Sequence, residues 1–160
     1  GRLVVARLGC PKGRSMSAAE RNRGARCEVQ VVNYLRSVGF PDARRYLAGD
    51  GKQPGDIDAI PGVSIEVKDV ARSSWPSWRL QAVTAAGGRI PVVLRRTRGV
   101  SDVGQWLCHV PWDRWNELGG WVTMLYPTAA VCARTERIWA QVPFADVVAL
   151  LEPVVLDGAQ

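Results

Sequence analysis

The chain has 160 residues, 47% of them hydrophobic and 22% charged, which suits a globular domain with a buried core and excludes a disordered chain. No apolar run approaches the roughly 20 residues of a membrane-spanning helix, and the apolar stretch near the start is too short for a secretory signal. The formal net charge of +6 favours a polyanionic partner such as nucleic acid. We therefore expect a soluble, cytoplasmic protein that binds nucleic acid and has no membrane partner.

The first 16 residues are basic and irregular, with two glycines and a proline after position 8, and they predict a flexible N-terminal arm. Met16 is typical of a natural start, which would make the residues before it an upstream extension. Residues 17–160 have the length of a single domain, which is our prediction for them.

A capping-box pattern marks the start of the first predicted helix. Ser17 is followed three positions later by Glu20, and such a pair satisfies the free N–H groups at a helix N-terminus. Apolar residues then recur at helical spacing over positions 31–38, and Gly39 is a stop signal. This helix carries Glu28.

A β-hairpin is predicted over residues 55–69, after a polar, glycine-rich segment at 41–53 that predicts a loop or an irregular strand. Within 55–69, apolar and charged positions alternate on either side of Pro61 and Gly62. Such alternation is typical of strands with one face in the core and one face outside it.

The charged residues of this hairpin are predicted to share one face. With a three-residue loop over residues 61–63, Asp58 lies opposite Glu66. Two positions along, Asp56 lies opposite Lys68. Because side chains alternate across a strand, all four emerge on the same side. A two-residue loop would instead split the group.

The rest of the chain alternates between helices and strands. Pro76 near its start and Gly87 after its end frame a second helix. The predicted elements are a helix over 75–86, a strand within 89–97, a strand ending at Val110, a helix over 111–118, a strand over 137–142 and a helix over 143–151. This order predicts an α/β domain with a mixed sheet covered by helices.

The cluster of Asp56, Asp58 and Glu66 needs a cation, because three neighbouring carboxylates repel one another. Mg²⁺ favours carboxylate oxygens and would relieve that repulsion. The alternative is a solvated strand face whose charges form ordinary salt bridges. We favour the metal site, because the intervening positions are apolar and Lys68 follows Glu66 by two residues.

Lys68 is one of only three lysines among the 21 basic residues. An ammonium approaches a water molecule or a phosphate as a compact point charge, which a guanidinium does not. Together with Asp56 and Glu66 it supplies the parts for phosphodiester hydrolysis, in which a divalent metal stabilises negative charge and activates water.

The segment GDIDAIPGVSIEVK, with the helix segment RGARCEVQVVNYLRSVGF before it, resembles the PD-(D/E)xK nuclease superfamily. It is most similar to archaeal-type and phage Holliday-junction resolvase-like endonucleases. The resemblance covers about residues 20–112 and implies a restriction-endonuclease-like core, a mixed β-sheet flanked by helices, with residues 113–160 as a C-terminal extension. A proline directly before the signature aspartate is absent, since Pro54 stands two positions ahead of Asp56.

Carried over by position, the resemblance implies that Asp56, Glu66, Lys68 and Glu28 are catalytic. Asp56, Glu66 and Glu28 would bind Mg²⁺, for which Mn²⁺ would substitute. Asp58 matches no required position and is a possible accessory ligand.

Further residues are assigned roles with an open alternative. Gln81 resembles a glutamine that some branches place beside the active site, and otherwise is a surface or packing residue. Trp75 and Trp78 could stack on unpaired bases, but core positions are more common for such residues. Candidates for phosphate contacts are the arginines that flank the site in sequence, with nonspecific surface positions as the alternative: Arg44, Arg45, Arg72 and Arg79.

Two other residue types are given no functional role. His109 is the single histidine and has no visible partner in the sequence. The four cysteines are scattered without a CxxC pair, so structural zinc is disfavoured and free buried thiols are predicted.

The sequence thus predicts a Mg²⁺-dependent endonuclease acting on DNA, most simply a Holliday-junction or other branched structure. The resemblance implies a homodimer, because symmetric cutting of a four-way junction needs two sites related by a twofold axis. One alternative is a nuclease for flaps, ends or a specific duplex sequence. Another is a non-catalytic DNA-binding protein with a degenerate nuclease fold.

Overall fold

The computed structural model describes residues 17–47, 53–117, 130–132 and 137–157. The predicted N-terminal arm, residues 1–16, lies outside this part of the chain. The helices are α1 (Ala18–Ser37), α2 (Trp75–Ala86), α3 (Trp112–Glu117) and α4 (Phe144–Asp157), with a 3-10 turn, η1 (Val103–Gln105). The strands are β1 (Arg44–Arg45), β2 (Ile57–Asp58), β3 (Val63–Lys68), β4 (Ile90–Arg95), β5 (Leu107–Pro111), β6 (Ala130–Cys132) and β7 (Arg137–Pro143).

The described strands form one seven-stranded sheet in the order β1-β2-β3-β4-β5-β7-β6. Strands β3 and β4 are parallel and are joined through α2, and the other neighbours are antiparallel. The fold is therefore α/β with a mixed sheet flanked by helices, as predicted, and is consistent with a restriction-endonuclease-like core.

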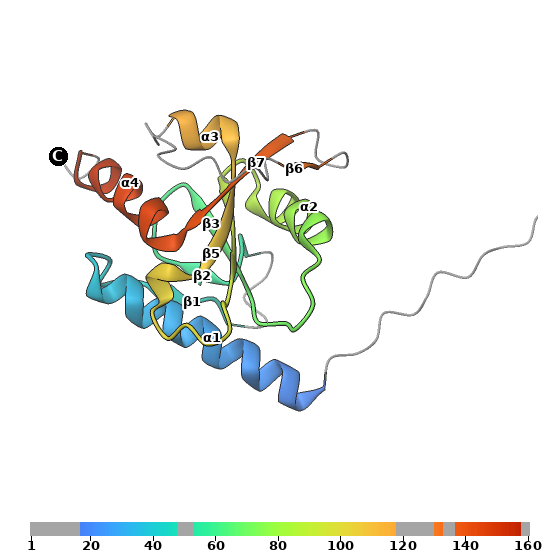
Figure 1. The fold of residues 1–160 in the computed structure, drawn as a ribbon. Coiled ribbons are helices and arrows are strands. Elements are labelled where there is room, and N and C mark those ends of the chain that lie inside the picture. Colours follow the sequence, from blue (N-terminus) through green and yellow to red (C-terminus); the bar gives the residue numbers. More distant parts are fainter. Residues whose placement is uncertain (1–16, 48–52, 118–129, 133–136, 158–160) are drawn as a thin grey trace, which may run out of the picture.

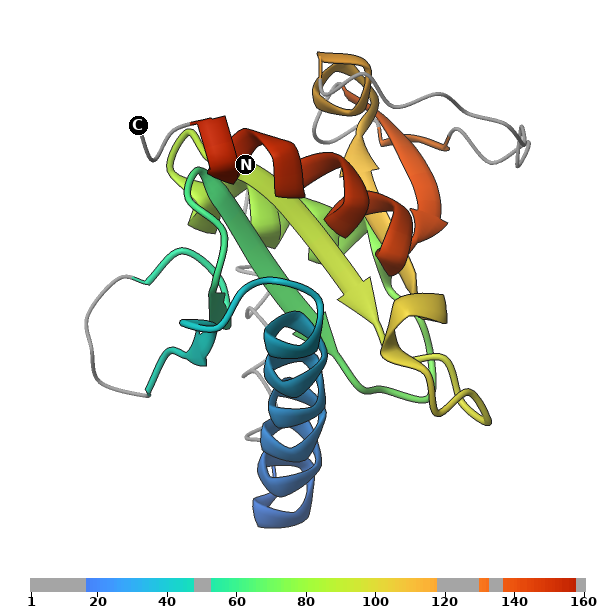
Figure 2. The same ribbon diagram turned by 90° about the vertical axis from the view of Figure 1, so that its left-hand side faces the viewer.

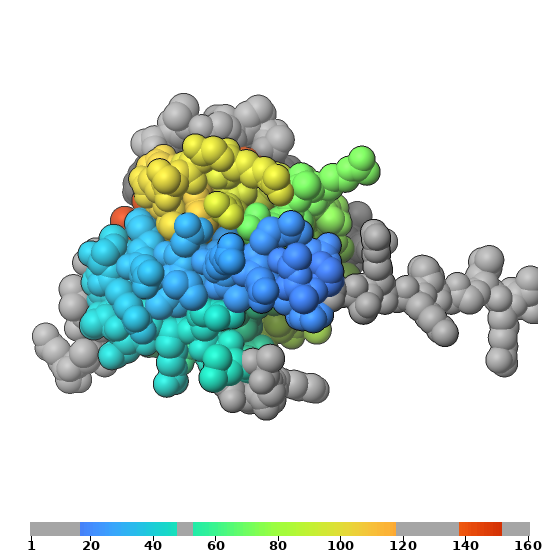
Figure 3. Space-filling model, turned by 90° about the horizontal axis from the view of Figure 1, so that it is seen from below, coloured from blue at the N-terminus to red at the C-terminus, as the bar shows by residue number. Residues whose placement is uncertain are grey.

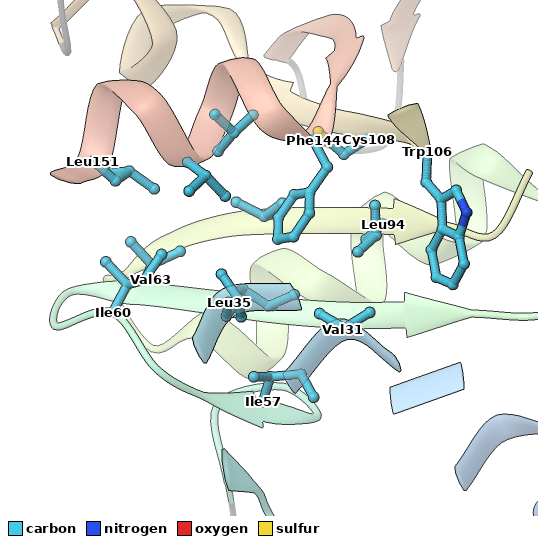
Figure 4. Close-up of a cluster of buried hydrophobic side chains, with 14 of the residues drawn as sticks. Val31, Leu35, Ile57, Ile60, Val63, Leu94, Trp106, Cys108, Phe144 and Leu151 are labelled. Carbon is cyan, nitrogen blue, oxygen red and sulfur yellow. The ribbon is translucent and has the colours of Figure 1, made fainter. Parts of the chain in front are cut away.

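Helices cover both faces of the sheet (Figures 1 and 2). In Figure 2, α1 and α4 lie in front of the sheet and α2 lies behind it. The main core forms on the α1 and α4 side and includes Leu35, Leu94 and Phe144 (Figure 4). A smaller cluster, around Trp78 and Val93, lies under α2.

Strand β3 divides its side chains between these two faces. Ile65 and Val67 belong to the main core on the α1 side. Because side chains alternate along a strand, Glu66 and Lys68 project toward the α2 side. Lys68 indeed contacts Gln81 of α2. The candidate site is therefore built between the central strand β3 and helix α2.

The C-terminal extension completes the fold. Strand β7 pairs along β5, with Val110 opposite Ala140, and the side chains of Phe144, Val147 and Leu151 from α4 are buried in the main core. An extension that served only as a dimer contact would leave these apolar side chains exposed before assembly. Strand β7 and helix α4 instead contribute to the same hydrophobic core as α1, through Ala140, Val142, Phe144, Val147, Val148 and Leu151.

The helix predictions are confirmed by the local structure. Ser17 and Glu20 form the capping box, with Glu20 Oε2 accepting from Ser17 N at 2.7 Å and Ser17 Oγ accepting from Glu20 N at 3.2 Å. Helix α2 has the predicted bounds and ends at Gly87 in the left-handed conformation, with φ +55°. No helix in the described part of the chain is long and apolar enough to cross a membrane.

The register of the hairpin differs from the prediction by two residues. Ile57 lies opposite Ile65, whereas the predicted loop would place it opposite Val67. The turn itself also differs from the predicted three-residue loop: Ile60 O accepts from Val63 N at 3.1 Å, which closes a four-residue β-turn, and Gly62 adopts φ +76°. A shift of two preserves which side chains share a face, but it changes which of them are neighbours.

The prediction of free buried thiols is confirmed for two of the four cysteines. Cys27 and Cys108 are free and fully buried. Burial raises the pKa of the Cys27 thiol to about 12, with a smaller contribution from the nearby Asp69 carboxylate. These thiols therefore remain protonated near neutral pH.

Candidate functional site

The backbone around Gly55 fixes the position of Asp56. Gly55 has φ +85°, and a Cβ at this position would lie 2.5 Å from Ile65 O. The close approach lets Asp56 N donate to the same carbonyl at 2.7 Å. In return, Asp56 Oδ2 accepts from Val67 N at 2.8 Å. The Asp56 carboxylate is thereby anchored against β3, next to Glu66.

Glu66, Lys68 and Gln81 form a chain of polar contacts. Lys68 Nζ donates to Glu66 Oε2 at 3.2 Å and to Gln81 Oε1 at 3.2 Å. The side chain of Glu66 is 8% exposed and that of Lys68 is 17% exposed. Glu66 and Lys68 thus meet in a mostly buried environment with Asp56 beside them, and Gln81 contacts Lys68 from the exposed surface of α2. We call Asp56, Glu66, Lys68 and Gln81 the hairpin cluster.

The electrostatics of the hairpin cluster favour binding of an additional positive charge. Burial raises the pKa of Glu66, the Asp56 carboxylate raises it further, and Lys68 partly offsets both effects. One ammonium therefore does not balance two adjacent carboxylates. A divalent cation, which prefers carboxylate oxygens, suits this donor pair.

Glu28 lies apart from this donor pair, in an ion pair with Arg45. Glu28 Oε2 accepts from Arg45 Nε at 2.6 Å and lies 2.5 Å from a terminal nitrogen of the same guanidinium. Within the described ranges, no three His, Cys, Asp or Glu side chains gather as a metal-binding group would require. The structure therefore brings Asp56 and Glu66 together and leaves Glu28 with Arg45.

Asp58 does not join the hairpin cluster, contrary to the expectation that the four charged residues form one group. It lies opposite Arg44 in the β1–β2 pair, and its Oδ2 is 2.7 Å from a terminal nitrogen of that arginine. The reason is the hairpin register, which places Asp58 at the level of Ser64 rather than Glu66. Asp58 forms a salt bridge at the sheet edge.

Arg79 is buried, so the prediction that it contacts phosphate on the surface is wrong. Arg79 is 4% exposed, because its position on α2 directs the side chain toward the sheet. The guanidinium donates to His109 Nδ1 at 3.0 Å through Nε and lies 5.8 Å from the ring centroid of Trp139. Arg44 and Arg72 are exposed, and Arg45 is half-buried.

His109 has partners that the sequence does not reveal. Its ring stacks on Trp75 with the centroids 3.6 Å apart, and Nε2 lies 3.0 Å from Gln141 Oε1. Burial lowers the pKa of His109 to about 4, so the ring is neutral and accepts from Arg79. We call His109, Arg79, Trp75 and Gln141 the α2 anchor, because they tie α2 to β5 and β7. Trp78 is buried beside them, which confirms the core interpretation for this residue.

The α2 anchor and the hairpin cluster lie on the same face of the sheet and both use α2. Arg79 and Gln81 are two positions apart on this helix, and each contacts a different strand.

Comparisons of this chain with protein-family models, with curated proteins and with solved structures gave no match.

Proposed function

We propose that this protein is a Mg²⁺-dependent endonuclease that hydrolyses phosphodiester bonds in DNA, with branched DNA as its substrate. The observation that carries the proposal is the meeting of Asp56, Glu66 and Lys68 in a mostly buried setting. These are three of the four residues that the superfamily resemblance makes catalytic; the fourth, Glu28, is paired with Arg45.

Asp56 and Glu66 would hold the cation, and Mn²⁺ would substitute for Mg²⁺. One Asp56 oxygen accepts from the Val67 amide and one Glu66 oxygen accepts from Lys68, and the Asp56 and Glu66 carboxylates are themselves in hydrogen-bond contact. When bound, the metal would act as a Lewis acid that stabilises negative charge on the phosphate. Glu28 would contribute only if it left Arg45.

Lys68 would orient the attacking water and neutralise part of the phosphate charge. Its ammonium carries three donors, of which two serve Glu66 and Gln81. Gln81 would thus be a positioning residue that holds Lys68 over the hairpin cluster. The two contacts with Glu66 and Gln81 would then fix the direction of the third N–H bond of the Lys68 ammonium.

Branched DNA and a homodimer enter the proposal through the resemblance. A four-way junction presents two equivalent strands, and paired cuts require two active sites related by a twofold axis. The exposed arginines Arg44 and Arg72 and the net charge of +6 support a DNA partner. Arg45 would contribute to phosphate binding with the part of its guanidinium that Glu28 leaves open.

A panel of labelled substrates tests the proposal. A four-way junction, a matched duplex and single-stranded DNA are each incubated with the protein in Mg²⁺ or in EDTA. Paired symmetric nicks confined to the junction in Mg²⁺ are expected. Cutting of all three substrates would indicate a general nuclease instead of a junction resolvase. Absence of cutting by a folded protein would refute the proposed nuclease activity.

A second candidate is a non-catalytic DNA-binding protein on a nuclease-like fold. The ion pair between Glu28 and Arg45 favours it, because a helix carboxylate that is fully engaged with an arginine does not complete a three-carboxylate site. In the substrate panel this candidate predicts junction or duplex binding of equal strength in Mg²⁺ and EDTA, with no product.

A further inference from the structure

The first half of α1 projects beyond the sheet. All four buried residues of this 20-residue helix, from Cys27 to Leu35, lie at or after its tenth residue. Residues 18–26 contain no buried side chain. Figures 1 and 2 both show this darker blue end of the helix extending past the strands. We call residues 18–26 the projecting half of α1.

Two features of the projecting half work against its own stability. Helices gain most of their stability from tertiary packing, which this segment lacks. It carries three arginines, Arg21, Arg23 and Arg26, of which Arg21 lies at the end of the first turn, where the helix dipole disfavours positive charge. Local conflicts of this kind are expected where a segment has a function.

Gly24 is a further residue that destabilises this part of the helix, because glycine in a helix interior is unfavourable. No steric reason for it is found among the described atoms, since a Cβ would meet only Glu28 Oε1, at 3.9 Å. Glycine on an exposed helix lets another backbone approach closely. Arg21, three positions earlier, and Glu28, four positions later, lie on the same helix face.

We propose that the projecting half of α1 is a docking surface for the DNA backbone, with Arg21 contacting phosphate and Gly24 allowing the backbone to approach the helix. Its charge is complementary to a polyanion, with three arginines against Glu20, which the capping box engages. Figure 3 shows α1 open along this face of the molecule. Along the same helix face this surface leads to Glu28.

Binding of a labelled DNA duplex, measured by fluorescence anisotropy in EDTA at several salt concentrations, tests this surface. Arg21→Ala is expected to weaken binding about tenfold and to lower the salt slope by about one. Arg26→Ala is the matched control, because it removes the same charge from the same helix, about 160° away from Gly24 at 3.6 residues per turn. It is expected to change affinity by no more than about twofold.

Gly24→Ala separates function from stability. It is expected to raise the melting temperature, since alanine is the better helix former, while it weakens DNA binding at least about fivefold because the methyl group blocks the approach. Unchanged binding by Gly24→Ala, or equal losses in Arg21→Ala and Arg26→Ala, would overturn the docking surface, as would a wild-type protein that does not bind DNA. A protein that binds DNA but does not cleave it would refute only the nuclease, so the two failures are distinguishable.

A second, independent observation concerns Arg95 at the end of β4. Arg95 lies directly beside Lys68 in the parallel β3–β4 pair, and therefore on the same face of the sheet. Its Nε is buried without a hydrogen-bond partner in the described part of the chain. Orphaned buried donors are rare because each costs the desolvation of the group.

We infer that Arg95 binds a phosphate of the substrate next to Lys68, an inference that rests on the proposed nuclease function. A guanidinium can offer two parallel N–H donors to a phosphate, and a shift of the Arg95 side chain toward the phosphate would give its buried Nε the partner that it lacks in the protein alone. Arg95 would then complete a basic pair, Lys68 and Arg95, facing the carboxylates of Asp56 and Glu66.

Arg95→Met tests this role because it removes the guanidinium and keeps most of the apolar stem. Melting at or above the wild-type temperature is expected, since an unsatisfied donor is lost, together with a single-turnover cleavage rate lower by about 10²-fold. Arg95→Lys should recover part of the rate. Arg89→Met, an exposed arginine before the other end of β4, should change the rate by no more than about twofold.

The opposite pattern would overturn the role of Arg95. A lower melting temperature with an unchanged rate would make Arg95 a structural residue. If the wild-type protein binds DNA without cleaving it, the proposed nuclease function is refuted, and the role of Arg95 is tested by DNA affinity alone. Loss of affinity in Arg95→Met but not in Arg89→Met would then retain the phosphate contact, and equal affinities would exclude it.

Discussion

Lys68 lies two residues after Glu66 on the same strand, and its ammonium nitrogen is 3.2 Å from Glu66 Oε2. Alternation puts residues two apart on one face of a strand, so the E-x-K spacing is what allows this contact. The position of β3 in the middle of the sheet buries the pair. Burial, in turn, makes the charge balance of the hairpin cluster sensitive to each member.

Lys68→Met is expected to reduce cleavage by about 10²-fold or more while DNA affinity changes little. The reason is that Lys68 contacts Glu66 and Gln81 within the cluster rather than the outer surface. Single-turnover kinetics and anisotropy on the same junction measure the two effects. Lys68→Arg, which keeps the charge but not the compact ammonium, should recover only part of the rate, with DNA affinity again close to that of the wild type. Full activity in Lys68→Met would exclude the lysine from the mechanism.

Asp56→Asn is expected to weaken Mn²⁺ binding at least about tenfold, because it removes one of two carboxylates at the proposed cation position. Glu28→Gln is the comparison, since Glu28 is held by Arg45. The Mn²⁺ affinity of this variant should stay within about threefold of that of the wild type. Mn²⁺ titration followed by electron paramagnetic resonance measures both. Equal losses in the two variants would mean that Glu28 leaves Arg45 to bind the metal.

Gly55→Ala is expected to destabilise the fold by at least about 2 kcal/mol, because positive φ and a steric clash act together. A Cβ would lie 2.5 Å from Ile65 O, whereas at Gly62, also at positive φ, nothing lies within 4 Å. Gly62→Ala should therefore lose only about 1 kcal/mol. Urea denaturation compares the two. Equal destabilisation would show that the Gly55–Ile65 contact does not constrain Asp56.

Stability is expected to fall as the pH drops below about 6.5, because His109 is neutral in the folded protein with a pKa of about 4. Above the pKa of His109 in the unfolded chain, the ring is neutral in both states and does not change the unfolding free energy with pH. Below that pKa, the unfolded chain takes up a proton that the folded α2 anchor does not accept, so the folded state loses stability. The full loss, reached below pH 4, is about 3 kcal/mol.

His109→Gln isolates this contribution, because glutamine is neutral at every pH and His109 is the single histidine of the chain. The difference in unfolding free energy between wild type and variant should shrink from pH 7 to pH 4. Parallel profiles would indicate that the His109 ring is accessible to protons in the folded state.

The sequence predicts those parts of the structure that depend on neighbouring residues. The capping box of Ser17 and Glu20 and the glycine at the end of α2 are local signals, and both helices begin and end close to the predicted positions. The joint position of Glu66 and Lys68 also follows from local alternation along one strand. Strand β6 was missed, because three residues carry too little periodicity to be recognised.

The remaining features depend on contacts between distant segments. Arg79 and His109 are 30 positions apart, and no spacing rule connects them. The register places Ile57 opposite Ile65 rather than Val67, and Asp58 pairs with Arg44 of a strand that the sequence marks only weakly. Register and partner choice are set by the assembled sheet, not by the hairpin segment alone.

The most direct test of the nuclease account is single-turnover incision of a labelled four-way junction by wild-type protein and by Asp56→Asn, each in Mg²⁺ and in EDTA. The account predicts product only for the wild type in Mg²⁺, with DNA binding preserved in all four reactions. Incision that persists in EDTA or in Asp56→Asn would contradict it, as would a folded wild-type protein that binds the junction in Mg²⁺ and leaves it intact.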